Sequence, residues 1–404
     1  MPVYLLATMD TKGAEARYVR SLLTEWGCDV HLMDVGCLGE PAGDAETGRE
    51  AVFEAAGARH ADVVARGDRG EAVTLAAEGA RRLLAAAHDA GRVDGVLAIG
   101  GSAGTTIGTT AMRALPIGVP KLMVSTLASG NVRPYVGDKD LMMLNSVVDI
   151  AGLNRISRPI LARAAAAMAG MVRHQPPSAA DDRPLIAATM FGVTTPCVQR
   201  AREELERAGY EVLVFHATGN GGQAMESLIR DGLIAGVLDM TTTELADELV
   251  GGVLSAGPDR LTAAAACGVP QVVSVGATDM VNFGPPETIP EAFSARRFYH
   301  HNPTVTLMRT TLEENRELGR EIARKVAASR GPAAILLPRH GVSAIDRQGE
   351  PFDDAAAREA LFDAIRRHAG EVECIEVAAH INDEAFAVAA ARKLLELIQA
   401  TARN

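Results

Sequence analysis

A run of glycine and hydroxyl residues is the strongest candidate for chemistry in this sequence. It reads GGSAGTT and follows the apolar stretch GVLAI. Glycine lets the backbone approach an anion, hydroxyl groups donate hydrogen bonds, and the start of a helix presents free N–H groups. A tight strand–helix turn without a ligand is the alternative. We expect a phosphate site formed by Gly100, Gly101, Ser102, Ala103, Gly104, Thr105 and Thr106.

This run matches neither of the common glycine-rich phosphate motifs. It lacks the lysine of GxxxxGK[ST], and it lacks a strict GxGxxG. The segment TMDTKG supplies a cation, Lys12, at the end of another expected strand. Asp10 in the same segment can hold Mg²⁺, or it can cap a helix expected to begin near Ala14. The expected site therefore includes Asp10, Thr11, Lys12 and Gly13.

Two more expected strand ends carry polar residues. Asp34 closes the second expected strand, where an acid commonly holds a ribose hydroxyl in dinucleotide folds. Ser125 and Thr126 follow a later strand, in STLASGN. Ligands of open parallel sheets bind beyond the carboxyl ends of the strands. We therefore expect the loops 9–13, 34–39, 100–106 and 125–131 to converge on one site.

Apolar strands alternate with amphipathic helices along the chain, which predicts an α/β fold with mainly parallel sheets covered on both faces. The expected strands are 3–8, 29–34, 62–65, 94–99, 120–124, 185–190, 211–215, 235–239, 271–275, 333–337 and 372–377. The Ala-rich stretches 76–90 and 160–171 favour helices, and LMML (141–144) reads as core filling. The last helical segment can close the second domain or pack across both.

The length of 404 residues predicts more than one domain. The proline-containing segment HQPPSAADDRP (174–184) marks the boundary, giving domains 1–178 and 179–404. The halves resemble each other: GVLAIGG parallels GVLDMTT, and IGVPKLMVS parallels CGVPQVVSV, in the same order. We expect two Rossmann-like domains that arose by duplication of one α/β unit.

The second half carries many polar residues in segments expected to be loops. We expect a catalytic pocket for a small anionic substrate, with an Arg fork for a carboxylate or phosphate and a His for proton transfer. The alternative is that these side chains make separate structural hydrogen bonds. Thr241 and Glu244 have the spacing of a capping box. No HxH or HExxH occurs, so no metal-binding residues are predicted. The pocket residues are Asp279, His301, Asn302, Arg309 and His380.

Composition excludes several classes of partner. A net charge of −11 argues against binding to nucleic acid or to anionic membrane, and 4 % aromatic residues offer few stacking platforms. No apolar run reaches the roughly 20 residues that span a bilayer, and the first residues lack a basic segment before their apolar run. The five scattered cysteines form no CxxC pair. We expect a reduced, cytoplasmic protein.

Many phrases of the sequence, in one order, resemble the Tm-one-like ATP-binding family. They include ATMDTKGAE, IGGSAGTTIGTTAM, GLNRISRPIL, HATGNGGQAMESLI, YHHNPTVTLMRTT and LPRHGVSAID, and the resemblance runs from the first expected strand to the last helix. It implies two α/β domains, of which the N-terminal one binds an ATP-type nucleotide, ATP or ADP, and a homodimer. The family's nucleotide site maps onto MDTKG and GGSAGTT. Ala103 departs from relatives that have another glycine there.

Two classes of function follow from these expectations. One is an enzyme that uses the nucleotide to act on a small anionic metabolite at the domain interface. The other is a nucleotide-binding regulatory or protein-interaction module without turnover. The density of polar residues in the second half favours the enzyme.

Overall fold

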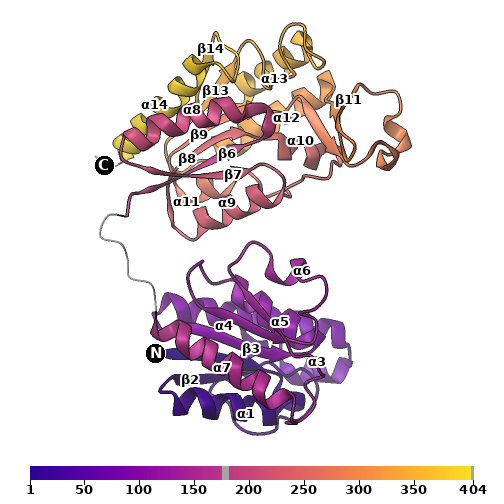
Figure 1. Cartoon of the computed structure of the whole chain (residues 1–404), viewed down its shortest axis with the longest axis vertical. Coiled ribbons are helices and arrows are strands. Elements are labelled where there is room, and N and C mark those ends of the chain that lie inside the picture. The colour runs from indigo at the N-terminus through magenta and orange to yellow at the C-terminus, as the bar shows by residue number, and fades with distance from the viewer. Residues whose placement is uncertain (175–181, 402–404) are drawn as a thin grey trace. The chain divides into compact units, whose positions relative to one another are not determined.

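The computed structural model describes residues 1–174 and 182–401. The chain divides into two compact units, Met1–Ser178 and Ala179–Asn404, and each has its own sheet with helices on both faces (Figure 1). The central part of the expected boundary segment lies outside the described residues.

The sheet of the first unit is parallel throughout. Its strand order is β2-β1-β3-β4-β5. Apolar residues with buried side chains run along β1 and β3, as strands covered on both faces require. The strands are β1 (Pro2–Ala7), β2 (Asp29–Asp34), β3 (Gly95–Gly100), β4 (Lys121–Ser125) and β5 (Met142–Asn145).

Helices cover both faces of this sheet and form two hydrophobic cores. One core joins the sheet to α2, α3, α4 and α5, and the other joins it to α1 and α7. The Ala-rich stretches lie in α4 and α7, where small buried side chains allow close packing. The helices are α1 (Met9–Glu25), α2 (Arg49–Ala55), α3 (His60–Arg66), α4 (Arg69–Asp89), α5 (Ser102–Arg113), α6 (Arg133–Val136) and α7 (Ser157–Arg173).

The main sheet of the second unit is also parallel, with the order β14-β13-β9-β8-β6-β7. An antiparallel sheet, β10-β12-β11, follows β9 along the chain. The strands are β6 (Leu185–Met190), β7 (Glu211–His216), β8 (Ile234–Thr241), β9 (Gln271–Gly276), β10 (Met280–Phe283), β11 (Phe298–Asn302), β12 (Val305–Arg309), β13 (Ala333–Pro338) and β14 (Glu373–Val377).

The helices of the second unit fall into groups, and each group shares a hydrophobic core. Helices α8 and α14 share one core with the sheet, so the last helix packs within its own unit. Helices α10, α12 and α13 share a second core, and helices α9 and α11 share a third core. The helices are α8 (Thr195–Arg207), α9 (Asn220–Arg230), α10 (Thr243–Val250), α11 (Ala263–Cys267), α12 (Leu312–Ala327), α13 (Ala355–His368) and α14 (Glu384–Thr401), with short 3₁₀ turns at Gly192–Thr194, Pro286–Thr288 and Glu291–Phe293.

The α/β architecture with two Rossmann-like domains confirms the fold expected from the sequence. The order β2-β1-β3-β4 of the first sheet corresponds to β7-β6-β8-β9 of the second. This shared order is what duplication of one α/β unit predicts.

Several expected elements were wrong. The segment 62–65 lies in helix α3, which ends at the left-handed Gly67, because a short apolar run does not distinguish a strand from a helix. The LMML segment contributes β5, where Met142 is 52 % exposed. Residues 298–309 form an antiparallel hairpin instead of a loop. Helix α1 begins at Met9 and is kinked at Lys12.

Within the described residues, no helix has both the length and the apolar character needed to cross a membrane.

Candidate functional site

A pocket of about 610 Å³ opens at the carboxyl ends of the first unit's strands. Loops after β1, β2, β3 and β4 line it, so the four loops expected to converge do meet. The strand order reverses between β1 and β3, and this is the crevice where open α/β sheets bind ligands. Its lining is Thr8, Asp10, Thr11, Lys12, Cys37, Leu38, Gly39, Arg69, Val73, Gly101, Ser102, Ala103, Gly104, Thr126, Leu127 and Asp149.

The N-terminus of α5 faces this pocket. Gly101 is the N-cap residue, and the first N–H groups of the helix have no acceptor within it. A Cβ atom at Gly100 would lie 2.7 Å from the Cα of Gly104, so this glycine permits close packing of the helix on its strand. A Cβ at Gly101 would come no nearer than 3.8 Å to the hydroxyl of Thr126. The side of Gly101 that faces the pocket is therefore open.

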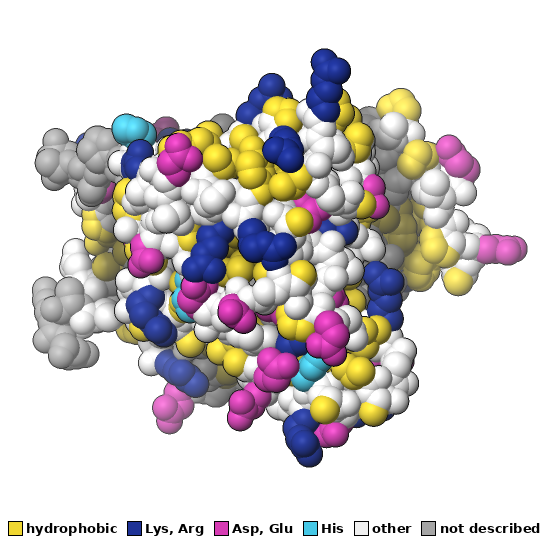
Figure 2. Space-filling view, turned by 90° about the horizontal axis from the view of Figure 1, so that it is seen from below, with side chains coloured by type: hydrophobic (Ala, Val, Ile, Leu, Met, Phe, Trp, Pro, Cys, Tyr) yellow, Lys and Arg dark blue, Asp and Glu magenta, His cyan; other side chains and the backbone are white. Residues whose placement is uncertain are grey.

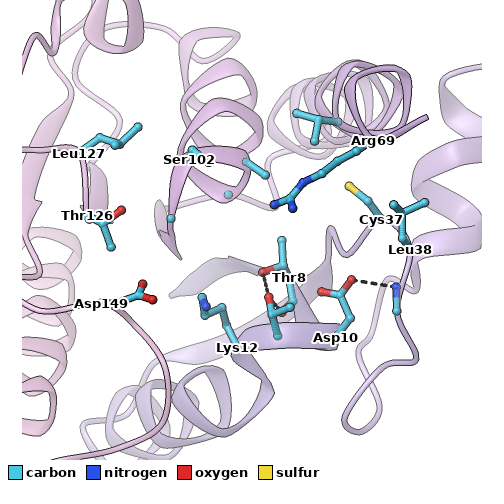
Figure 3. A pocket seen from close by; sticks show the side chains of 16 residues that line it. Thr8, Asp10, Lys12, Cys37, Leu38, Arg69, Ser102, Thr126, Leu127 and Asp149 are labelled. Carbon is cyan, nitrogen blue, oxygen red and sulfur yellow. Dashed lines mark hydrogen bonds between the residues drawn. The ribbon is translucent and has the colours of Figure 1, made fainter. Parts of the chain in front are cut away.

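Two cationic side chains reach the same space from different elements. Lys12 comes from the kink in α1, and Arg69 is the first residue of α4. Figure 3 shows both pointing into the pocket, with the guanidinium of Arg69 extending toward the start of α5. Lys12 thus occupies the position expected of a cation that the glycine run lacks. Arg69 was not predicted from the sequence; it reaches the pocket from the first turn of α4.

Carboxylates complete the polar lining. Asp10 accepts a hydrogen bond from the N–H of Gly39 through Oδ2, at 3.2 Å, while its Oδ1 is buried without a hydrogen-bond partner among the described residues. Asp149 lies on the side of the pocket toward which Lys12 extends (Figure 3). Mg²⁺ in proteins is held by one or two carboxylates together with phosphate oxygens and water. Asp10 and Asp149 lie on opposite sides of the pocket in Figure 3, with Lys12 between them, so each carboxylate would hold such an ion separately.

The remaining lining offers apolar surface. Leu38, Val73 and Leu127 contribute side chains suited to the face of a planar base. Cys37 lies on the same side of the pocket as Leu38 (Figure 3), and burial together with nearby Asp10 raises the pKa of its thiol to about 11. The cysteine is therefore a neutral part of the wall and no nucleophile near neutral pH.

Asp34 does not line the pocket, contrary to the expected ribose contact. Its side chain is buried, and Oδ1 accepts hydrogen bonds from the N–H groups of Met9 at 3.0 Å and Gly36 at 2.8 Å. Its Oδ2 pairs with the guanidinium of Arg49, at 2.8 Å from Nε. The carboxylate therefore fixes the start of α1 to the end of β2.

Other expected ligands also have structural partners. Thr105 and Ser125 are buried, with their hydroxyl oxygens 2.6 Å apart. Thr106 donates its hydroxyl to the carbonyl of Ser102 at 3.1 Å. Gly13 is buried against the loop after β2, because a Cβ there would lie 2.7 Å from that of Ala42. These residues position the site, while Thr126 stays in the lining.

In the second unit, buried charged side chains are bonded to one another and to the backbone at the carboxyl ends of β7 and β8. Glu244 accepts hydrogen bonds from the N–H groups of Gly219 at 2.7 Å and Gly222 at 3.1 Å, at the start of α9. Arg260, fully buried, donates to Glu244 at 2.6 Å and to both oxygens of Asp239. An internal carboxylate thus occupies the amides that an external anion would need. Glu244 is not the member of a capping box that the spacing predicted, since the N-cap Thr242 makes no side-chain cap.

The predicted catalytic residues of the second half lie in different surroundings. Arg309 is buried on β12, and its guanidinium donates to the carbonyl of Phe352, the hydroxyl of Thr310 and the carboxylate of Asp346. Asp279 is fully buried beside it, and Ser343 donates to its Oδ2 at 2.8 Å. Burial and the neighbouring Asp346 raise the pKa of Asp279 to about 7.

His380 is held as a neutral ring by two hydrogen bonds. Its Nε2 is 2.8 Å from the carbonyl of Ser343, which only accepts, so Nε2 carries the proton. Its Nδ1 accepts from the N–H of Asn382 at 3.1 Å. Burial lowers the pKa of this imidazole. Both ring nitrogens are therefore occupied within the protein.

His301 and Asn302 are exposed on the edge strand β11, and Asn302 accepts hydrogen bonds from Thr304. The cavity beside His380 is lined by neither of them, nor by Arg309. The structure therefore brings Asp279 and Arg309 together, places His380 near them through Ser343, and leaves His301 and Asn302 apart. The alternative of separate structural hydrogen bonds describes Arg309, Asp279 and His380, and their catalytic roles stay predictions.

On the face shown in Figure 2, acidic and basic side chains are interspersed with hydrophobic ones. The described residues of that face form no continuous basic strip of the kind that nucleic acids bind.

Comparisons with known proteins give a consistent picture. Models of the N-terminal and C-terminal domains of the uncharacterised protein family UPF0261 match residues 1–177 and 183–398. A UPF0261 protein of Clostridium tetani is 48 % identical over 98 % of this chain and 99 % of its own length. A UPF0261 protein of Rhizobium meliloti is 47 % identical over 96 % of this chain and 97 % of its own. The tomato ToMV resistance protein Tm-1 is 44 % identical over 81 % of this chain and 45 % of its own length.

Proposed function

The chain belongs to the uncharacterised protein family UPF0261, and from this premise we propose that its N-terminal unit binds an ATP-type nucleotide. The phosphates lie at the start of α5, where Gly101, Ser102, Ala103 and Gly104 present backbone N–H groups. Lys12 and Arg69 neutralise their charge, and Asp10 would be a ligand of the Mg²⁺ that accompanies the nucleotide.

One observation carries the proposal. Free helix amides and cations from two further elements share one pocket at the strand-order reversal of the first sheet. The resemblance to an ATP-binding family points the same way.

Binding of phosphate by backbone N–H groups depends on the number of phosphates that reach them. Calorimetric titration of the full chain with ATP, ADP, AMP and adenosine, each with Mg²⁺, tests the proposal. Affinity should fall in that order, because each lost phosphate removes charge-assisted hydrogen bonds. Equal affinity for ATP and adenosine would place the phosphates outside this pocket.

A non-catalytic nucleotide-binding module is the second candidate, and a specific observation favours it over the enzyme. The side chains expected to perform chemistry in the second half are bonded within the fold. Phosphate release from ATP by the purified chain distinguishes the two candidates. Turnover that disappears in Lys12→Ala would establish an enzyme. A cytoplasmic location and a homodimer remain part of the proposal.

A further inference from the structure

A second cavity, of about 520 Å³, lies at the carboxyl ends of β13 and β14 in the second unit. Arg339 and His340 directly follow β13, and His380 and Asp383 follow β14. Arg347 and Gln348 come from the loop before α13, and Arg358 from that helix. It is separate from the strand ends of β6 and β8, where Arg260 is buried.

The charge of this cavity is predominantly positive. Its lining contains three arginines and one carboxylate, Asp383. That carboxylate accepts the N–H of His380 at 2.8 Å, which uses part of its capacity. The guanidinium of Arg347 is exposed and forms no ion pair or hydrogen bond with any described residue. An unpaired cation among others of the same sign is stabilised by a bound anion.

The other two arginines are held in place by acids behind them. Arg339 donates through Nη1 to Glu376 at 2.5 Å, and Arg358 donates through Nη1 to Asp346 at 2.9 Å. Each guanidinium has five N–H donors in a rigid fork. Donors therefore remain for a ligand, while the ion pairs limit the motion of the side chains.

The backbone of the site is fixed by bonds that extend the pairing of β13 and β14 beyond the strands. The N–H of Arg339 donates to Val377 and that of His340 to Ala379, both at 3.0 Å. Gly341 has φ +133°, and a Cβ there would lie 1.9 Å from the carbonyl oxygen of Asp346. The loop thus adopts a conformation that requires glycine, and it fixes the direction in which Arg339 and His340 leave the sheet.

We propose that this cavity is a binding site for a small oxyanion, the phosphate or carboxylate group of a metabolite, held by Arg339, Arg347 and Arg358. Paired N–H donors of guanidinium match both groups. His380 forms a neutral wall, since both of its ring nitrogens are bonded within the protein. The site takes no part in the nucleotide proposal, and of the residues expected to form a pocket in the second half it contains only His380.

The test uses the full chain carrying Gly101→Val, so that phosphate does not enter the pocket of the first unit. Inorganic phosphate and succinate are titrated separately by calorimetry at constant ionic strength. We expect saturable binding of at least one of them at one site per chain. Binding of phosphate alone assigns a phosphate ligand, and binding of succinate alone assigns a carboxylate.

Arg347→Ala should weaken this binding about tenfold or more, since a hydrogen bond between charged groups is lost. The exposed guanidinium has no internal partner, so the variant should unfold at the same temperature as its parent. Arg367→Ala, which removes an exposed arginine of α13 outside this lining, is the control and should change affinity less than twofold. Unchanged affinity in Arg347→Ala, or no saturation by either anion up to about 10 mM, overturns the proposal.

Discussion

The hydroxyl oxygen of Thr105 lies 2.6 Å from that of Ser125, and this contact joins the first turn of α5 to the end of β4. Both residues are buried. Ser125 Oγ also accepts the N–H of Leu127, at 2.9 Å. The hydroxyls therefore hold the helix start against the neighbouring strand, while the backbone of residues 101–104 faces the pocket. The proposed phosphate donors are amides positioned by this contact.

Thr105→Val should lower the free energy of unfolding by about 1 to 3 kcal/mol, because it leaves the Ser125 hydroxyl without one of its partners in a buried site. ATP affinity should change less than about threefold. Chemical denaturation and calorimetry measure the two effects. Thr106→Val, at the less buried neighbouring hydroxyl, is the control. A large loss of ATP affinity with unchanged stability would show that Thr105 contacts the phosphates.

Gly101→Val should weaken ATP binding by at least tenfold, because its side chain would enter the space of the phosphates. The free protein has room for the new Cβ, so the fold should survive. Gly192→Val is a matched control, since a Cβ at Gly192 also meets open space, in the other unit. Calorimetry on both variants gives the comparison. Undiminished ATP affinity in a folded Gly101→Val protein would contradict the placement of the phosphates beside Gly101.

Lys12→Ala should weaken ATP binding roughly ten- to a hundredfold, since a hydrogen bond between charged groups contributes about 1.5–3 kcal/mol. The loss should be smaller for AMP, which has fewer phosphates to contact. Lys12→Arg keeps the charge and should retain most of the affinity. A change below twofold in Lys12→Ala would mean that the ammonium group stays in solvent.

Arg69→Ala should lower ATP affinity about tenfold or more and leave the weaker binding of adenosine unchanged. Its control is Arg66→Ala, because Arg66 is close in sequence but pairs with Glu71. Titration with ATP and with adenosine separates a phosphate contact from a general loss of structure. If both ligands weaken equally, Arg69 shapes the pocket without touching phosphate.

Asp279→Asn should change how stability depends on pH. The pKa of Asp279 is raised to about 7 in the folded protein from an ordinary value of 3.8. Between these values the folded state retains a proton that the unfolded state releases. The free energy of unfolding therefore falls as pH rises, by up to about 1.4 kcal/mol per pH unit for one proton.

Asp279→Asn removes the proton of Asp279 from this balance. The free energy of unfolding should therefore depend less steeply on pH between pH 4.5 and 7. The substitution should not abolish the pH dependence of stability, because burial also raises the pKa of Asp247 to about 7. Urea denaturation across this range makes the measurement. An identical slope in both proteins would show that Asp279 is ionised throughout.

The sequence predicted the sheet strands and the site loops well where the residues themselves impose the structure. Long apolar runs such as β3 require burial on both faces, and the glycine run before α5 requires a close turn. The loops after β1 and β3 met because parallel strands place their carboxyl ends at one edge. That rule alone predicts that the four expected loops meet at one edge of the sheet.

The remaining features depend on tertiary contacts that local patterns do not encode. Asp34 was expected at a ribose, but Arg49, fifteen positions later, takes its carboxylate. Arg69 was missed because it reaches the pocket from the first turn of α4, and only the tertiary fold brings that turn to the strand ends. The histidines of β11 looked like site residues, yet a hairpin leaves them exposed. Side-chain partners distant in sequence decide each of these cases.

The most direct test of the central claim is a crystal structure of the full chain with Mg²⁺ and a non-hydrolysable ATP analogue. The account predicts phosphate oxygens within hydrogen-bond distance of the N–H groups at the start of α5. It also predicts Lys12 and Arg69 on those oxygens, and Mg²⁺ next to Asp10. A nucleotide bound elsewhere, with this pocket containing only solvent at saturating concentration, would contradict it.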